Sequence, residues 1–265
     1  MVEVASLHIY PIKSGRGVSL ERMPLDRIGP VADRRWMVVD DGRNLVTQRE
    51  YPRLCLLAAL TTPVGLRLEA PGLDGLETPF PEPKSNRVLV RVWKDQVAAF
   101  DGGNRAAQWL SDFLGASVRL VYFPDDGERR TDSNYDPLGG SVGFADGFPI
   151  LIISQESLDD LNRRLPSPLP MDRFRPNVVV RGAAPFAEDG WKRFWINGVE
   201  FNGVKPCARC VMTTTDQATA ERAPHEPLRT LATFRKQGGG VMFGSNVVHR
   251  GGGSIALGNR LTFDP

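Results

Sequence analysis

Three pairs of short apolar segments flank tight-turn sequences, and this pattern constrains the fold more than any other feature. Asn197-Gly198 separates residues 194–196 from residues 199–201, and this dipeptide is the strongest short signal for a hairpin turn. Turns at Asp41-Gly42 and Lys94-Asp95 lie between further alternating segments. The chain is therefore predicted to build antiparallel sheets from short strands.

Helices are expected to be few. The 265 residues include 27 glycines and 21 prolines at 41% hydrophobic content, which is typical of a folded chain with many turns. A helix is predicted over residues 105–114, with Asn104 as its cap and Gly115 at its end. A second helix should follow Ser154, and a third should cover residues 228–236.

A polar segment divides the chain. Residues 124–143 are rich in Asp, Gly and Pro, and a connection of this length is unusual inside a compact unit. We therefore predict two domains, residues 1–123 and residues 124–265, although the segment can equally be a mobile loop over a site. The predicted fold class is mixed α/β and β-rich, with a small antiparallel sheet or barrel first.

Charge and hydropathy exclude several classes of function. The 33 basic and 31 acidic residues leave a net charge of +2, which gives no bulk attraction to nucleic acid or to a membrane surface. No apolar run approaches the roughly 20 residues that span a bilayer, and the N-terminus lacks the pattern of a secretory signal. A cytoplasmic protein is expected, in which three cysteines fit a thiolate role better than a disulfide framework.

The run 205–214 concentrates reactive side chains. It contains Cys207, Arg209 and Cys210, and an arginine beside a thiol favours the thiolate form and binds anions. Zinc would need further paired ligands, and a thioredoxin-like pair would need a helix where residues 211–215 predict a strand. A structural disulfide and two inert cysteines are the remaining alternatives. Chemistry is expected here before any other stretch.

Basic residues also accompany two other turns. Lys13 and Ser14 lie in a loop with two glycines, a composition that suits a phosphate although the Walker A spacing is missing. Arg173, Arg175 and Asn177 precede an apolar strand at residues 178–180. Solvated turns and surface arginines remain open as alternatives at both places.

Taken together and in order, these stretches resemble the MOSC-domain proteins that carry an N-terminal MOSC β-barrel module. The similarity is greatest to the mitochondrial amidoxime-reducing components and their bacterial relatives, and it covers essentially the whole chain. It implies a β-barrel-like module over residues 1–123 and a MOSC β-barrel domain with a few peripheral helices over residues 124–265. The matching stretches are residues 11–18, 33–36, 174–180, 188–191, 206–214 and 243–246.

The resemblance implies a molybdenum cofactor of the molybdopterin type. Cys210 matches the family's cysteine ligand of the metal, and the family is also described as binding pyridoxal phosphate. Cys207 is then a neighbour of the ligand. The residues that match the family's cofactor-binding positions are Lys13, Ser14, Arg34, Arg175, Asn177, Arg209 and Asn246.

Two positions depart from the relatives. Where they carry small hydroxyl residues, this chain has Asp146-Gly147-Phe148, and where they carry a tyrosine it has Asn246. Asp189 and Asp216 are candidate proton carriers, with a solvated role as the alternative.

The implied activity is a molybdenum-dependent reduction of amidoximes, hydroxylamines and N-hydroxylated bases. Because the sequence stops at Pro265 without a ferredoxin-like domain, electrons are expected from a separate donor, such as a ferredoxin-like protein, a flavodoxin, or a cytochrome or flavoprotein reductase. The main alternative is a sulfurase-type protein that carries sulfur or the cofactor. A binding module for another phosphorylated ligand stays open as well.

Overall fold

The Asn197-Gly198 hairpin forms where its turn residues predict it, whereas the chain after Asp41-Gly42 has isolated bridges at Asn44 and Leu45 and a turn at residues 48–50 in place of the predicted strand. Strands β14 (Arg193–Ile196) and β15 (Val199–Arg209) pair antiparallel, with positive φ angles of 50° at Asn197 and 77° at Gly198. Both residues of this turn type need positive φ, which these residue types adopt most readily. Strands β9 (Arg87–Val92) and β10 (Asp95–Asp101) form a second predicted hairpin. The structure, a computed structural model, describes residues 1–264.

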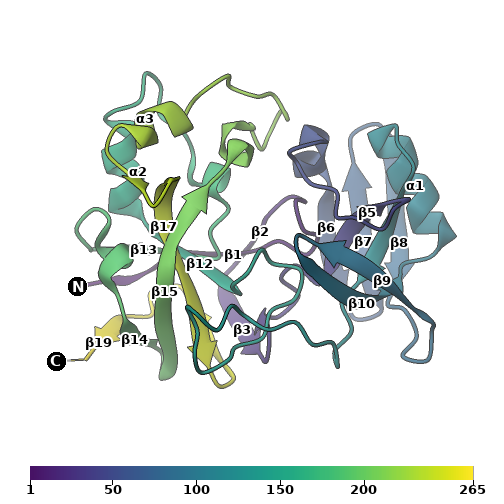
Figure 1. Cartoon of the computed structure of the whole chain (residues 1–265), viewed down its shortest axis with the longest axis horizontal. Helices are drawn as coiled ribbons and strands as arrows, with labels where there is room; N and C mark the ends of the chain where they lie inside the picture. Colours follow the sequence, from purple (N-terminus) through teal and green to yellow (C-terminus); the bar gives the residue numbers. More distant parts are fainter. Residues whose placement is uncertain (265) are drawn as a thin grey trace.

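The largest sheet draws on both ends of the chain, and Figure 1 shows it in one lobe of the molecule. Among the pairs of named strands in this sheet, only β12 and β13 are parallel, and the other pairs are antiparallel. In order across the sheet, its strands are β19 (Leu261–Phe263), β14, β15, β17 (Gly240–Arg250), β12 (Ile150–Ser154), β13 (Val178–Arg181), β1 (Glu3–Ile9) and β2 (Val18–Leu20), with β16 (Lys236–Gln237) beside β17.

The second lobe contains two smaller sheets. The first sheet contains, in order, β5 (Trp36–Asp40), β11 (Val118–Tyr122), β10 and β9. The second contains β6 (Ala58–Thr62), β7 (Gly65–Ala70) and β8 (Leu73–Pro79). A third small sheet contains β18 (Gly253–Ala256), β3 (Arg22–Asp26) and β4 (Gly29–Pro30). The β-rich mixed fold class is thus confirmed.

Three α-helices and four short 3₁₀ helices complete the described chain. The α-helices are α1 (Asn104–Leu114), α2 (Gln155–Asn162) and α3 (Leu228–Ala232). The 3₁₀ helices are η1 (Pro52–Leu56), η2 (Met171–Phe174), η3 (Ala187–Gly190) and η4 (Val211–Thr214). Within residues 1–264, no helix combines the length and the apolar character needed to cross a membrane.

Strand β12 shows why its sequence is a continuous apolar run. Ile150 and Ile152 belong to one hydrophobic core, while Leu151 and Ile153 belong to another on the opposite face. Successive side chains of a strand point to opposite faces, so a strand covered on both sides must be apolar throughout. The central position of β12 brings the residues that precede it to the junction of the two lobes.

The predicted helices α1 and α2 are present, with small corrections at their ends. Ser154 caps α2 as predicted, and its hydroxyl accepts a hydrogen bond from the backbone N–H of Ser157. The cap of α1 is Gly103 and not Asn104, while Gly115 ends this helix in the left-handed conformation as predicted. Helix α3 ends at Ala232, and the segment that follows returns to pair with β17 as β16.

The strand predicted over residues 211–215 is wrong. These residues form η4, and local hydrogen bonds explain the difference. The Thr213 hydroxyl donates to the Cys210 carbonyl at 3.0 Å, and the Thr214 hydroxyl donates to the Val211 carbonyl at 2.8 Å. Side-chain bonds of this kind compete with sheet pairing and outweigh the β-propensity of Val and Thr.

The polar segment 124–143 is anchored by buried polar contacts. Asp136, only 2% exposed, accepts hydrogen bonds from Thr131 and Gly140 and pairs with Arg250 of β17. Strands β1 and β2 belong to the largest sheet, whose other strands come from the second half of the chain. The first strands of the chain are therefore not part of the second lobe, which the following residues form. The domain boundary after residue 123 stays a prediction.

Gly203 of β15 carries a packing constraint that alanine should violate. A Cβ atom there would lie 1.7 Å from the Trp191 carbonyl oxygen, and the Gly203 N–H donates to Lys192 at 2.8 Å. We expect Gly203→Ala to lower the free energy of unfolding by about 1–3 kcal/mol, measured by chemical denaturation. Gly190→Ala is the control, since its Cβ would meet no atom within 4 Å. Equal stability of the two variants would contradict the prediction.

Candidate functional site

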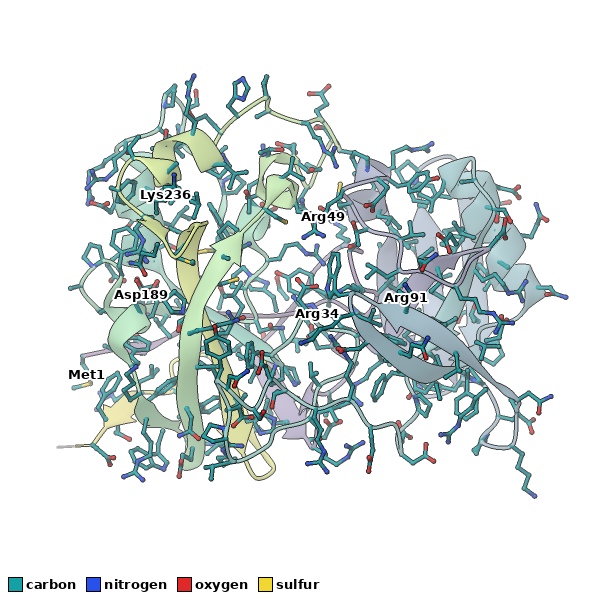
Figure 2. The ribbon with its side chains drawn as sticks, viewed as in Figure 1. Met1, Arg34, Arg49, Arg91, Asp189 and Lys236 are labelled. Atoms are coloured by element: carbon teal, nitrogen blue, oxygen red, sulfur yellow. The ribbon has the colours of Figure 1, made fainter. Side chains whose placement is uncertain are left out.

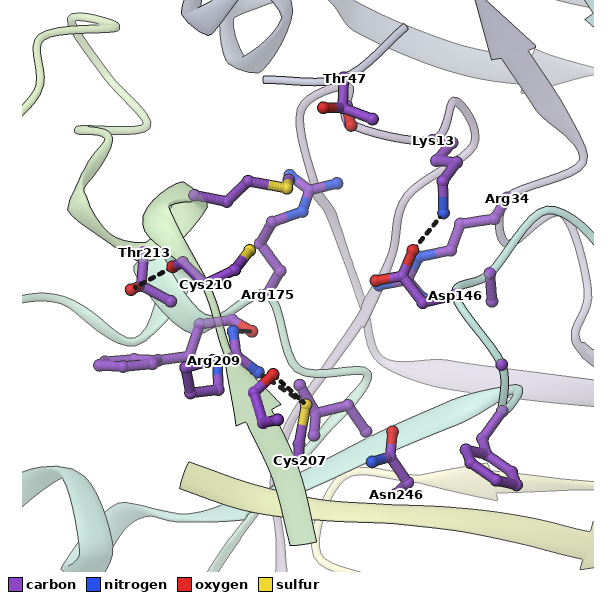
Figure 3. Close-up of a pocket in the computed structure, with 18 of the residues that line it drawn as sticks. Lys13, Arg34, Thr47, Asp146, Arg175, Cys207, Arg209, Cys210, Thr213 and Asn246 are labelled. Atoms are coloured by element: carbon purple, nitrogen blue, oxygen red, sulfur yellow. Dashed lines mark hydrogen bonds and ion pairs between the residues drawn. The ribbon is translucent and has the colours of Figure 1, made fainter. Parts of the chain in front are cut away.

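The residues predicted from separate stretches of the sequence line one cavity at the junction of the two lobes. The cavity is open to solvent and is lined by basic, sulfur-containing and aromatic side chains from both lobes. Figure 3 shows the cysteines and Arg209 on one side of this cavity and Lys13 with Arg34 on the other. The predicted residues that line it are Lys13, Ser14, Arg34, Arg175, Asn177, Arg209, Cys210 and Asn246, together with Cys207.

Unusual backbone conformations are concentrated at this cavity. Nine described residues other than glycine have positive φ, and four of them line it. These are Ser14 at 67°, Arg34 at 47°, Trp93 at 56° and Arg175 at 55°. Such conformations are costly for residues with a Cβ and persist where the surrounding structure imposes them, commonly at ligand sites.

Two arginines are held against one buried tyrosine. The guanidinium carbon of Arg34 lies 4.7 Å from the centre of the Tyr10 ring, and that of Arg175 lies 4.1 Å from it. The Tyr10 hydroxyl donates to the Pro176 carbonyl at 3.0 Å, which fixes the ring. Burial raises the pKa of Tyr10 to about 12, and the flanking guanidinium groups offset only part of this effect. Tyr10 is therefore a neutral platform that orients both cations.

Asn177 joins the loops of the two halves. Its amide oxygen accepts from Arg34 at 3.1 Å and from the Leu151 N–H at 3.2 Å. Its amide nitrogen donates to the His8 carbonyl and to Asp33, both at 3.1 Å. These four bonds use the whole hydrogen-bonding capacity of an amide side chain. Asn177 thus positions Arg34 and has no group left for a ligand.

The cavity contains more positive than negative charge. Five cations line it, and three of them have a carboxylate partner. The pairs are Lys13 with Asp146 at 2.5 Å, Arg34 with Asp33 at 2.6 Å and Arg173 with Asp216 at 2.7 Å. Among residues 1–264, no carboxylate lies within salt-bridge distance of Arg175 or Arg209. Two positive charges are therefore uncompensated.

Three arginines that line the cavity have buried nitrogens without a hydrogen-bond partner in the described chain. Within residues 1–264, six buried side-chain atoms lack a hydrogen-bond partner, and the three nitrogens among them are Arg173 Nε, Arg175 Nη2 and Arg209 Nε. Buried donors are nearly always satisfied in folded proteins, and leaving one unpaired costs about 1–3 kcal/mol. Three such donors around one cavity indicate that it binds a ligand rich in acceptors.

Burial lowers the pKa of two cations of the cavity. Desolvation lowers the pKa of Arg175 to about 10, although nearby Tyr10 opposes this shift. Desolvation likewise lowers the pKa of Lys13, and the Asp146 carboxylate counteracts part of the effect. Arg175 remains a cation at neutral pH and attracts an anion strongly from its low-dielectric surroundings.

The two cysteines occupy different environments at the end of β15. Cys207 Sγ accepts a hydrogen bond from Arg209 Nη1 at 3.2 Å, while Arg209 Nη2 donates to the Phe174 carbonyl at 2.6 Å. Cys210 follows the strand as the residue that begins η4. In the part of the chain that the structure describes, Cys210 Sγ has no hydrogen-bond partner and lines the cavity. It is the sulfur left available to a metal.

No described group of three or more His, Cys, Asp or Glu side chains is arranged to hold a metal ion. A structural zinc site takes four protein ligands, and a catalytic one takes three. A metal ion at Cys210 would therefore need most of its ligands from a bound group. The positive charge and the unpaired donors of the cavity fit a group that brings both metal ligands and an anion, as a molybdopterin cofactor does.

Both predicted proton carriers lie outside the cavity. Asp189 forms an ion pair with Arg235, and Figure 2 shows it far from Arg34 in the lobe of the large sheet. Asp216 is engaged by Arg173 and by the backbone of its own turn. Neither residue lines the cavity, and their role as proton carriers stays a prediction. Long-range ion pairs of this kind leave no signal in the local sequence.

Two residues that sequence reasoning did not select contribute to the cavity wall. Trp93 lies at the tip of the β9–β10 hairpin, and its indole N–H donates to Asp146 at 3.0 Å. Asp146 was noted only as a departure from the relatives. The positive φ of Trp93 follows from its place in a two-residue turn, a signal that the sequence offered without indicating a site.

Comparison with known families and proteins agrees with this arrangement. The family described as "MOSC N-terminal beta barrel domain" matches residues 1–117, and "MOSC domain" matches residues 139–262. Mitochondrial amidoxime-reducing component 1 of Xenopus laevis is 35% identical over 244 residues, which cover 88% of this chain and 71% of the relative.

The human relatives give the same result. Mitochondrial amidoxime-reducing component 1 of Homo sapiens is 35% identical over 273 residues, covering 97% of this chain and 81% of the relative. Component 2 of Homo sapiens is 36% identical over 241 residues, covering 88% and 72% respectively.

Proposed function

The chain belongs to the MOSC-domain family that includes the mitochondrial amidoxime-reducing components, and we propose that it reduces N-hydroxylated compounds at a molybdenum cofactor bound in the cavity beside Cys210. The relatives' names refer to amidoxime reduction. For this chain the substrates would be amidoximes, hydroxylamines and N-hydroxylated bases.

The observation that carries the proposal is the pair of uncompensated arginines. Arg175 and Arg209 leave a charge of about +2 in the cavity, and a phosphate monoester carries about −1.5 to −2 at neutral pH. Arg175 Nη2 and Arg209 Nε are buried without a partner among residues 1–264, so a phosphate or pterin acceptor that reached them would satisfy both donors. The charge and the donors of the cavity thus complement a phosphorylated cofactor.

Each residue then has a distinct task. Cys210 Sγ would bind the metal, since a thiolate is a soft ligand and this sulfur is otherwise unengaged. Arg175 and Arg209 would hold the anionic part, while Tyr10 and Asn177 keep Arg34 and Arg175 oriented. When bound, the cofactor supplies a metal that accepts oxygen and exchanges two electrons.

The overall reaction consumes two electrons and two protons. The N–O bond of the substrate breaks, the nitrogen gains hydrogen, and the oxygen leaves as water. Electrons would come from a separate donor such as a ferredoxin-like protein, a flavodoxin, or a cytochrome or flavoprotein reductase. The protein's own part is to bind the substrate between the lobes and to restrict water around the reacting nitrogen.

Elemental analysis tests this proposal. Protein purified from a host that makes the molybdenum cofactor should contain molybdenum and pterin near one per chain, with the pterin measured as its fluorescent oxidation product. The same protein should reduce benzamidoxime with a chemical electron donor. Absence of both metal and pterin, in a host that loads a control enzyme, would overturn the proposal. Bound cofactor that exchanges rapidly without any reduction would instead favour a carrier.

A further inference from the structure

Asp146 is held rigidly at the cavity wall, just before β12. Its carbonyl accepts a hydrogen bond from Arg129 Nη2 at 2.8 Å. Arg129 is 7% exposed, donates to two further carbonyls of the same loop and pairs with Asp95 of the β9–β10 hairpin at 2.8 Å. A buried arginine with these partners fixes the loop against the other lobe. The position of Asp146 is therefore built into the fold.

The carboxylate of Asp146 has one engaged and one free oxygen. Oδ1 accepts from Lys13 Nζ at 2.5 Å and from Trp93 Nε1 at 3.0 Å. Oδ2 has no partner among residues 1–264, and the side chain is 74% exposed to solvent where it borders the cavity. Desolvation by the cavity walls would raise the pKa of Asp146, but Lys13 outweighs it and holds the pKa well below its usual range. Oδ2 is thus an ionised acceptor.

This acceptor shares the cavity with the metal-binding sulfur. Figure 3 shows Asp146 beside Lys13 and across the cavity from Cys210. The aromatic side chains of Trp93 and Phe148 line the same wall. A small planar molecule that reaches toward Cys210 would present its remaining polar group to Oδ2 and its apolar part to the aromatic rings.

The chemistry of Oδ2 distinguishes two closely similar substrate groups. An amidoxime carries an NH₂ group on the carbon next to the N–OH nitrogen, while a hydroxamic acid carries a carbonyl oxygen there. A carboxylate accepts a hydrogen bond from the NH₂ group but meets the carbonyl oxygen as a second acceptor. The amidoxime therefore gains a charge-assisted hydrogen bond, whereas the hydroxamic acid brings two acceptors together.

We propose that Asp146 is the specificity-determining residue of this site, accepting an N–H hydrogen bond through Oδ2 and so selecting N-hydroxylated amidines and guanidines over hydroxamic acids. The reaction rests on the proposed function, and the binding preference rests on it in that the bound cofactor balances the charge of Arg175 and Arg209. Arg175 and Arg209 do not oppose this preference in the loaded protein, because the cofactor's phosphate neutralises them.

The variant Asp146→Asn gives a sharp test because its neighbours fix the orientation of the new amide group. Lys13 and Trp93 both donate to the position of Oδ1, so the amide oxygen must face them and the NH₂ group must replace Oδ2. The variant therefore presents a donor where the natural protein presents an acceptor. We expect the preference between NH₂ and carbonyl ligands to fall about tenfold or more, or to reverse.

The preference is measured as a ratio of dissociation constants for benzamidoxime and benzhydroxamic acid, two neutral probes that differ in this one group, without a reductant present. Calorimetry on the protein as purified supplies these values and needs no reductase activity. The ratio of kcat/KM for benzamidoxime and benzhydroxamic acid is the second readout. Asp126→Asn, which removes the same charge from an exposed residue paired with Arg87, should leave both ratios unchanged.

The outcomes separate this inference from the proposed function. A ratio that collapses in Asp146→Asn alone supports the assignment, even in a protein that reduces nothing. Proportional weakening of both probes leaves the ratio unchanged and means that Asp146 only supports Lys13, while unchanged affinity for both probes means that Asp146 does not contact the ligand. Either of these results would overturn the assignment, whatever the reductase assay shows.

Discussion

Replacement of Cys210 by serine should remove bound molybdenum and lower benzamidoxime reduction by about 100-fold or more. Cys210 Sγ lines the cavity and has no partner among the residues that the structure describes, so the metal would lose its only protein thiolate. A serine hydroxyl is a harder and less acidic ligand, and it does not replace a thiolate on a soft site. Metal content by elemental analysis and reduction rate are the two measurements.

Cys207→Ser is the matched control, because it makes the same change three residues earlier. Its sulfur accepts a hydrogen bond from Arg209 at 3.2 Å, and a serine hydroxyl can accept that bond in its place. This variant should keep most of its molybdenum. Full metal content in Cys210→Ser, or equal loss in both variants, would show that Cys210 is not the specific ligand.

Arg175→Met should reduce the pterin that stays bound through purification by about tenfold or more, since a hydrogen bond to a charged group contributes about 1.5–3 kcal/mol. Arg175 Nη1 donates to the Gly15 carbonyl at 2.6 Å, while Nη2 is buried without a partner. Methionine fills similar space but supplies neither the charge nor the donors. Pterin per chain is measured by fluorescence after oxidation, together with molybdenum.

Two further variants make this result interpretable. Arg175→Lys keeps the charge without the planar pair of donors, so it should retain more pterin than Arg175→Met but less than the natural protein. Arg91→Met removes an exposed arginine of β9 that does not line the cavity, and it should have no effect. Unchanged pterin in folded Arg175→Met would contradict a role for Arg175 in holding the cofactor.

Much of the fold could be predicted because its signals act over a few residues. The Asn197-Gly198 turn, the Ser154 cap and the Gly115 terminator all form as predicted, since turn geometry and capping depend on neighbours in the chain. The strand predicted over residues 211–215 failed for an equally local reason. There, threonine hydroxyls donate to backbone carbonyls and stabilise a 3₁₀ turn. Average strand propensities of Val and Thr do not account for such side-chain hydrogen bonds.

The candidate site was predicted less completely. Family resemblance selected the residues that the fold brings to one cavity, but not the tasks of all of them. Asn177 uses its whole amide to position Arg34, and Asp189 lies in an ion pair outside the cavity. The tasks of these residues depend on hydrogen-bond and ion-pair partners that are distant in the sequence, and the residue type alone does not predict which partner it meets.

The sequence by itself determined the β-rich fold class, the main hairpins and the family, because each depends on local patterns or on ordered motifs. Only the tertiary structure decided the charge balance of the cavity. Lys13 meets Asp146 across 133 positions of the chain, while Arg175 and Arg209 meet no carboxylate within residues 1–264. Coulombic interactions depend on distance in space, so only the folded chain decides which charges are neutralised and which remain for a ligand.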